Sequence, residues 1–147
     1  MSLKQRLMED LKISMRNKDK TKKNAIILIK SAIKQQEVDQ RVELQDEDII
    51  DIISKQLKQK RNSIEDFKKG NRKDLIELTN QEISILKTYM PNQLSEEELE
   101  DIIKKAIDET KAESKKDIGK VMSKVMPQIK GRADGSKVNK IVMKYLN

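Results

Sequence analysis

Apolar residues recur at helical spacing along most of this 147-residue chain, and this periodicity restricts the fold more than any other feature. Near the C-terminus, three segments beginning at Leu99, Ile118 and Val138 follow the i, i+3, i+4, i+7, i+8 pattern that places apolar side chains on one helix face. The chain has only four glycines and two prolines, which leaves little room for hairpin turns. Only two segments could be argued as strands. We therefore predict an all-α fold.

Pro91 marks the clearest boundary, because proline disfavours helical geometry in the residue before it. Ser95 and Glu98 then have the spacing of a capping box, which predicts that a new helix starts there. We expect an N-terminal multihelical domain over residues 1–90, followed by a small three-helix C-terminal bundle over residues 91–147.

Four helices are expected in the N-terminal domain. Ser2 and Gln5 have capping-box spacing, and the polar segment 17–24 is expected to separate the first two helices. Asp46 is a good N-cap for the third helix, and Gly70 suits the left-handed conformation that ends it. The side chains expected in the core are Leu3, Leu7, Leu11, Met15, Ala25, Ile29, Ile33, Ile49, Ile53, Leu57, Ile64, Phe67, Leu75, Leu78, Ile83, Leu86, Tyr89 and Met90.

The chain contains no cysteine and no histidine. Disulfides, thiolate nucleophiles, Ser-His-Asp triads and ordinary zinc sites are therefore excluded. The longest apolar run, residues 25–29, is too short to span a bilayer. Met1 leads directly into charged sequence, without the apolar segment of a secretory signal. We expect a cytoplasmic protein with no membrane association, no bound metal and no cofactor.

Basic residues are concentrated near the C-terminus. The net charge is +7, yet residues 91–110 hold two bases and seven acids, whereas residues 111–147 hold ten bases and three acids. This distribution favours a polyanionic partner, although a solvated lysine-rich surface would look the same. The candidate nucleic-acid-binding residues are Lys120, Lys124, Lys130, Arg132, Lys137, Lys140 and Lys144.

Aromatic residues constrain how RNA could be bound. The chain has only Phe67, Tyr89 and Tyr145, and all three lie on apolar stripes where we expect them to be buried. Readers of single-stranded RNA stack bases on exposed rings. Any RNA contact is therefore expected to depend on the phosphate backbone and on shape, with strong salt dependence.

The segment "GRADGSKVNKI" (131–141) predicts a tight turn between the last two helices. Gly131 is expected in the left-handed conformation after the middle helix. Asp134 can cap the last helix, with Gly135 at its first position and Ser136 as a competing cap. Most of this motif is thus expected to be structural.

Three segments together resemble the GatB/YqeY family: "DIGKVMSKVMPQIKGRADGSKVNKIVMKYL" (117–146), "LKQKRNSIEDFKKGNR" (57–72) and "YMPNQLSEEEL" (89–99). The chain is most similar to the stand-alone YqeY branch. The resemblance implies a helical domain followed by the module that forms the tail of GatB. GatB is a subunit of the bacterial amidotransferase that amidates Glu-tRNA(Gln) or Asp-tRNA(Asn), and its tail helps to hold the tRNA.

The resemblance implies an accessory role in translation, with tRNA or another structured RNA as the partner. A helical adaptor that docks on an aminoacyl-tRNA synthetase or an amidotransferase is the alternative. An enzyme is the third hypothesis: the family's associated activity is that of a carbon–nitrogen ligase with glutamine as amido donor. We expect no catalytic residues here, because the chain offers neither a nucleophile for ammonia release nor a phosphate-binding Gly-rich loop.

Several patterns admit a functional and a structural interpretation. Ser136 beside Lys137 or Lys140 could suggest Ser–Lys catalysis, but no spacing builds an oxyanion hole. Residues 96–98 are acidic and could suggest a metal site, but glutamates in the first turn of a helix are explained by its dipole. Residues 18–23 could form a second RNA contact or only a surface loop. Met122 and Met126 could form a partner surface, but core packing is the favoured interpretation.

Overall fold

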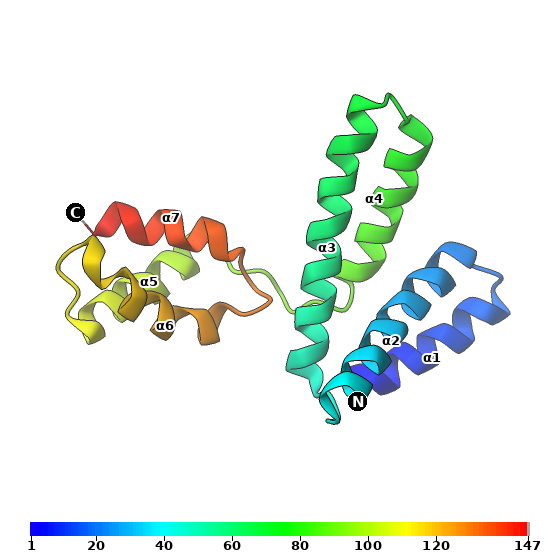
Figure 1. Ribbon diagram of the computed structural model, residues 1–147, viewed down its shortest axis with the longest axis horizontal. Coiled ribbons are helices and arrows are strands. Elements are labelled where there is room, and N and C mark those ends of the chain that lie inside the picture. The colour runs from blue at the N-terminus through cyan, green and yellow to red at the C-terminus, as the bar shows by residue number, and fades with distance from the viewer. Residues whose placement is uncertain (147) are drawn as a thin grey trace. The chain divides into compact units, whose positions relative to one another are not determined.

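The computed structural model describes residues 1–146, and over these residues it is all-helical and contains no strand (Figure 1). The prediction of an all-α fold is confirmed. Seven α-helices and one short 3-10 helix span the described residues: α1 (Leu3–Arg16), α2 (Lys20–Gln40), α3 (Asp46–Lys69), α4 (Lys73–Lys87), α5 (Glu96–Thr110), η1 (Lys115–Asp117), α6 (Ile118–Ile129) and α7 (Gly135–Tyr145).

The chain divides into two compact units, Met1–Met90 and Pro91–Asn147, which we call unit 1 and unit 2. Each unit has its own cluster of buried apolar side chains. The assignment of residues 1–90 and 91–147 as two domains remains a prediction. No helix among the described residues is long and apolar enough to cross a membrane.

Unit 1 consists of two helical hairpins. Helix α1 pairs with α2, α3 pairs with α4, and α2 also packs against both α3 and α4. The side chains of its core come from all four helices and from the turns at Leu44 and Tyr89: Leu7, Ile26, Ile29, Ile33, Leu44, Ile49, Ile52, Ile53, Leu57, Ile83, Leu86 and Tyr89.

Tyr89 follows the end of α4, and α1 holds it in place. Its ring is 3% exposed, and its hydroxyl donates a 2.5 Å hydrogen bond to a carboxylate oxygen of Asp10. The guanidinium of Arg6 lies 4.7 Å from the ring centroid and donates to the Thr88 carbonyl at 2.8 Å. Burial and the Asp10 carboxylate raise the pKa of Tyr89 above its ordinary value. Tyr89 therefore fastens the last turn of unit 1 to its first helix.

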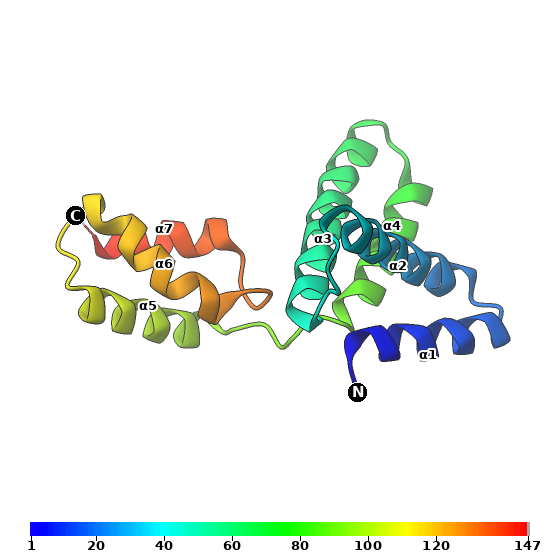
Figure 2. The same cartoon turned by 60° about the horizontal axis from the view of Figure 1, so that its bottom comes forward.

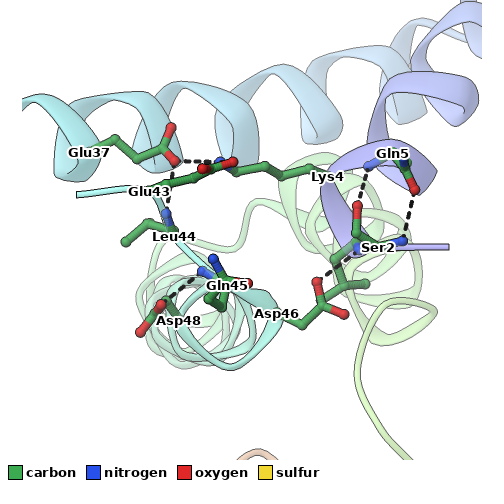
Figure 3. A network of polar contacts seen from close by, with 10 residues as sticks. Ser2, Lys4, Gln5, Glu37, Glu43, Leu44, Gln45, Asp46 and Asp48 are labelled. Atoms are coloured by element: carbon green, nitrogen blue, oxygen red, sulfur yellow. Dashed lines mark hydrogen bonds and ion pairs between the residues drawn. The ribbon is translucent and has the colours of Figure 1, made fainter.

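A polar network joins α1, α2 and the connector that leads to α3 (Figure 3). The Glu37 carboxylate pairs with the Lys4 ammonium and accepts the Leu44 N–H at 2.9 Å. The pKa of Glu37 is consequently lowered, chiefly by its hydrogen bond with Lys4 and then by that from Leu44. Asp46 accepts the Leu3 N–H at 3.0 Å, which ties the start of α3 to the start of α1.

Of three predicted helix ends in unit 1, one is confirmed and two are wrong by one residue. The Ser2–Gln5 capping box is confirmed. The predicted cap at Asp46 is wrong by one residue, because Gln45 is the N-cap and Asp46 is the first helical residue. The predicted left-handed glycine at Gly70 is also wrong: Gly70 has φ −84°, and the next residue, Asn71, takes the left-handed conformation with φ 56°.

The break between the first two helices is shorter than predicted. It covers residues 17–19 rather than 17–24, because the Asp19 side chain accepts the Lys22 N–H at 3.1 Å and starts α2 early. Two side chains expected in the core are exposed, Met15 at 59% and Leu78 at 43%.

In unit 2, α5, α6 and α7 pack against one another, and consecutive helices run in opposite directions (Figure 2). The Ser95 hydroxyl accepts the Glu98 N–H at 3.1 Å and starts α5. Pro127 lies in the last turn of α6. The core side chains are Leu99, Ile103, Ala106, Val121, Val125, Ile129, Val138, Val142 and Leu146. Ile129 was not predicted in the core, whereas the expected core residues Met126 and Tyr145 are exposed at 42% and 41%.

Candidate nucleic-acid interface

The turn between α6 and α7 is built from Gly131, Asp134 and Gly135. Gly131 has φ 74°, a left-handed conformation that is strained for residues with a Cβ. The Asp134 carboxylate accepts the Ser136 N–H at 3.0 Å, and Gly135 is the first residue of α7. Asp134, rather than Ser136, is therefore the N-cap of the last helix.

This turn is bonded to the segment that opens unit 2. The Leu94 N–H donates to the Arg132 carbonyl at 2.9 Å, and the Gln93 amide donates to the Gly131 carbonyl at 3.0 Å. The Arg132 guanidinium also donates to the Asn92 carbonyl at 3.4 Å. These contacts, which we call the clamp, could not be predicted from the sequence, because the partners lie about 40 positions apart and no local pattern marks them. Arg132 is thereby half-buried and has a structural contact.

Lys120 and Lys124 lie one turn apart on α6, and both have acidic neighbours. The Lys124 ammonium is 2.7 Å from a carboxylate oxygen of Glu109 on α5, and this contact lowers the pKa of Glu109. The Lys120 ammonium is 4.0 Å from Asp117, a carboxylate that also accepts the Glu113 N–H at 3.0 Å. The Glu113 hydrogen bond is the main reason that the pKa of Asp117 is lowered.

Lys137 on α7 is directed to a different part of α5. Its ammonium is 3.2 Å from a carboxylate oxygen of Glu96. Glu96 and Glu109 lie near opposite ends of α5, separated by about 20 Å along the axis at 1.5 Å per residue, and about 140° apart around it. The structure therefore does not bring Lys137 and Lys124 together.

A basic cluster instead lies at one end of the bundle, where α5 ends, α6 begins and α7 ends (Figures 1 and 2). We call this region the basic end. Its members are Lys111, Lys115, Lys116, Lys120 and Lys144. Lys140 lies one turn back along α7, whereas Lys130, Arg132 and Lys137 lie at the opposite end with the acidic first turn of α5.

Four acids also lie at the basic end. Glu109 and Asp117 are the acids that pair with lysines of α6, whereas Asp108 and Glu113 have no ion pair among the described residues. Four lysine side chains there have no polar partner within residues 1–146: Lys111, Lys115, Lys116 and Lys144. The basic end therefore keeps an excess of unpaired positive charge.

Lys120 and Lys144 are among the candidates chosen from the sequence, but Lys111, Lys115 and Lys116 in the α5–α6 connection are not. If one assumes that three consecutive helices pack antiparallel, these lysines are predicted to lie at the same end as Lys120 and Lys144. The net charge of residues 111–147 already contained that signal, because it includes Lys111, Lys115 and Lys116.

Tyr145 is the exposed aromatic ring at this end. The sequence predicted that its ring would be buried, which is wrong, because α7 directs it outward and Leu146 fills the core in its place. The Lys104 ammonium lies 5.8 Å from the ring centroid. One ring at this end of unit 2 is therefore partly exposed to solvent.

Within residues 1–146, no group of three or more aspartates and glutamates is arranged to hold a metal ion. The glutamates at residues 96–98 occupy the first turn of α5, where they meet its dipole. The residues considered for Ser–Lys catalysis make other contacts. The Ser136 backbone N–H donates to the Asp134 carboxylate, and the Lys137 ammonium is paired with Glu96.

The chain matches the family described as Yqey-like protein over residues 4–146. Similar proteins include Altered inheritance of mitochondria protein 41, mitochondrial, from three fungi. The Pyrenophora tritici-repentis protein is 34% identical over 96% of this chain and 79% of its own length. The Lachancea thermotolerans protein is 41% identical over 57% of this chain and 46% of its own length. A Saccharomyces cerevisiae protein is 39% identical over 75% of this chain and 62% of its own length. The chain belongs to the YqeY-like family.

The relatives correct one prediction. From the sequence we expect a cytoplasmic protein, but these relatives are mitochondrial by name, and the cytoplasmic assignment is therefore contradicted. The absence of cysteine, on which that expectation partly rested, does not distinguish among compartments, which is why the inference failed.

Proposed function

We propose that this protein is a non-catalytic accessory protein that binds structured RNA through the basic end of unit 2. The observation that carries the proposal is the set of unpaired lysines at that end, namely Lys111, Lys115, Lys116 and Lys144. Lysine ammoniums bind phosphates as point charges, without the fork geometry of arginine. The proposed contact is therefore with the RNA backbone.

tRNA is the first RNA to test, because unit 2 resembles the amidotransferase tail that contacts tRNA. Sequence preference is expected to be weak, because phosphate contacts position a protein without reading bases. Tyr145 could add one stacking contact beside these lysines. The proposal includes no chemistry, since the chain has no cysteine or histidine to act as nucleophile or base.

A filter-binding titration with total tRNA, at several salt concentrations, tests the proposal. The variant Lys115→Glu/Lys116→Glu/Lys144→Glu is expected to weaken binding, and to lower the slope of log affinity against log salt by about three. A matched control, Lys55→Glu/Lys58→Glu/Lys69→Glu, changes the net charge equally on exposed residues of unit 1. Equal effects of the two variants, or no tRNA binding at low salt, would exclude the basic end as the RNA interface.

A further inference from the structure

A groove of about 640 Å³ runs between α1 and α2 in unit 1. The two helices pack as an antiparallel hairpin (Figure 1), and the residues that line the groove come from both of them. Met8 and Leu11 line it from α1, and Ile27, Lys30 and Lys34 line it from α2. The proposed RNA interface lies in the other unit, so this groove is a separate feature.

The two walls of the groove differ in chemistry. The α1 wall is apolar: Met8 is 50% exposed, Leu11 is half-buried, and Met15, one turn beyond them on the same face, is 59% exposed. The α2 wall places Ile27, Lys30 and Lys34 at i, i+3 and i+7, so that they share one helix face. An occupant must therefore present an apolar edge to α1 and a negative edge to α2.

The charge in the groove is incompletely balanced. At one end, Lys4 is paired with Glu37, which also accepts the Leu44 N–H. Lys30 and Lys34 have no side-chain partner among the described residues. The two ammoniums, spaced by one helical turn, thus lie opposite the apolar α1 wall. They can pair with carboxylates spaced four residues apart on another helix.

We propose that this groove binds an acidic amphipathic α-helix of a partner protein. Its apolar face lies against Met8, Leu11 and Ile27, and its carboxylates pair with Lys30 and Lys34. This is the helix-in-groove mode of recognition, in which anchors at i, i+3/i+4 and i+7 fill the groove. The flexible side chain of Met8 suits such a surface.

A second copy of this chain does not supply that helix. Its most acidic helix, α5, already buries its apolar stripe, including Leu99, Ile103 and Ala106, in the core of unit 2. RNA would leave the apolar α1 wall without a partner. A bilayer surface would contact the rims of the groove rather than the half-buried Leu11 side chain of its α1 wall.

Site-specific photo-crosslinking in cells tests the proposal. Ser31 lines the groove and is exposed, so a benzophenone side chain at this position of the full-length protein reports the occupant. We expect the crosslinked product, analysed by mass spectrometry, to be a protein segment with apolar residues at i, i+3/i+4 and i+7 and carboxylates four residues apart. Crosslinking to RNA, to lipid, to a second copy of this chain, or to nothing would overturn the proposal.

A synthetic peptide of the captured segment then measures affinity by fluorescence anisotropy. Lys30→Glu/Lys34→Glu is expected to weaken binding at least tenfold, and a peptide with the facing glutamates changed to lysine is expected to restore it. Lys55→Glu/Lys58→Glu is the matched control, with the same charge change on exposed residues of α3. Equal losses in the two variants, or no rescue by the charge-swapped peptide, would contradict pairing at Lys30 and Lys34. Neither variant alters the basic end, so tRNA binding is measured independently.

Discussion

At the scale of single residues, the Asp134 carboxylate has a defined role, because it accepts the Ser136 N–H at the start of α7. Asp134→Ala is expected to lower the free energy of unfolding by about 1 kcal/mol, the usual cost of losing an N-cap. Urea unfolding monitored by circular dichroism measures this change. Ser136→Ala is the control and should change stability little, since the Ser136 side chain is exposed and does not cap the helix. If Ser136→Ala cost more stability than Asp134→Ala, the assignment of Asp134 as the N-cap would be wrong.

Tyr89 carries a second residue-scale prediction. Removing its hydroxyl in Tyr89→Phe is expected to cost about 2 kcal/mol, because the Asp10 carboxylate loses a buried donor. Tyr145→Phe is the control, because that ring is exposed. Guanidinium chloride unfolding of the two variants at pH 7 provides the comparison, and equal costs would contradict the role of the Asp10 contact.

The raised pKa of Tyr89 also predicts a pH dependence. The folded state binds the phenol proton more tightly than the unfolded state, so this stabilisation is present below about pH 10 and is lost as the pH rises above it. The loss of stability between pH 8 and pH 11 should therefore be smaller in Tyr89→Phe than in the unsubstituted protein. Lysine deprotonation contributes equally to both proteins, and an equal pH dependence would count against the inferred shift.

Residue-scale features could be predicted where their cause is local. Ser2, Ser95 and Asp134 stand a few positions from the N–H groups they cap, so the sequence alone indicates the contact. The environments of Tyr89 and Tyr145 are set by residues more than 40 positions away or by a helix's orientation in the bundle. Periodicity alone predicted burial for both rings, which is right for Tyr89 and wrong for Tyr145.

At the scale of helices and turns, two glycines of unit 2 should respond oppositely to alanine. Gly131→Ala is expected to destabilise by about 1 kcal/mol, because a Cβ is strained at φ 74°. Gly119→Ala is expected to stabilise by about 0.5–1 kcal/mol, since Gly119 is helical and nothing lies within 4 Å of its added Cβ. Thermal unfolding of both variants tests the pair, and a change of the same sign in both would contradict these assignments.

The network around Glu37 predicts how unit 1 responds to acid. Because the folded-state pKa of Glu37 is lowered, its stabilising contribution is present above about pH 4.5 and is lost as the pH falls below that value. Glu37→Gln should therefore reduce the acid sensitivity of unfolding relative to Glu9→Gln, whose parent side chain is exposed and unpaired among the described residues. Urea titrations at pH 7 and pH 3.5 make the comparison. Indistinguishable profiles would mean that the Lys4 and Leu44 contacts do not affect titration.

Helix boundaries could be predicted only where composition, capping and packing do not indicate different ends. Residues 20–24 look like a loop by composition, but the Asp19 cap and the packing of α2 against α1 make them helical. The clamp between Gln93 and Gly131 could not be predicted, because both partners look like ordinary turn residues. Local patterns thus located the helices, whereas contacts between distant turns required the structure.

At the scale of the whole molecule, the separate cores predict separable folding. Fragments 1–90 and 91–147 are each expected to be helical and to unfold cooperatively, because neither buried cluster draws on the other unit. Circular dichroism melts of the two fragments test this. In the intact chain, Asp134→Ala should shift only the transition of unit 2. Loss of helicity in either isolated fragment would show that its core is insufficient alone.

The candidate RNA site was only partly predictable at this scale. The excess of charge after residue 111 is visible in the sequence, but its location depends on the antiparallel order of α5, α6 and α7. Lys120, Lys124, Lys140 and Lys144 are all among the candidates for RNA contact that the sequence suggests. The ion pair between Lys124 and Glu109 directs one of these lysines to α5 instead.

The clamp between residues 92–94 and the turn at Gly131 also imposes an order on synthesis. Leu94 leaves the ribosome 38 residues before Arg132, the residue whose carbonyl it bonds. Unit 1 has all of its core partners by residue 90, so it can fold while the segment that follows it is still open. A nascent chain from which residues 91–131 have emerged, but not Arg132, would therefore display a finished unit 1 followed by an unclosed tail that is available to chaperones and proteases until the turn emerges.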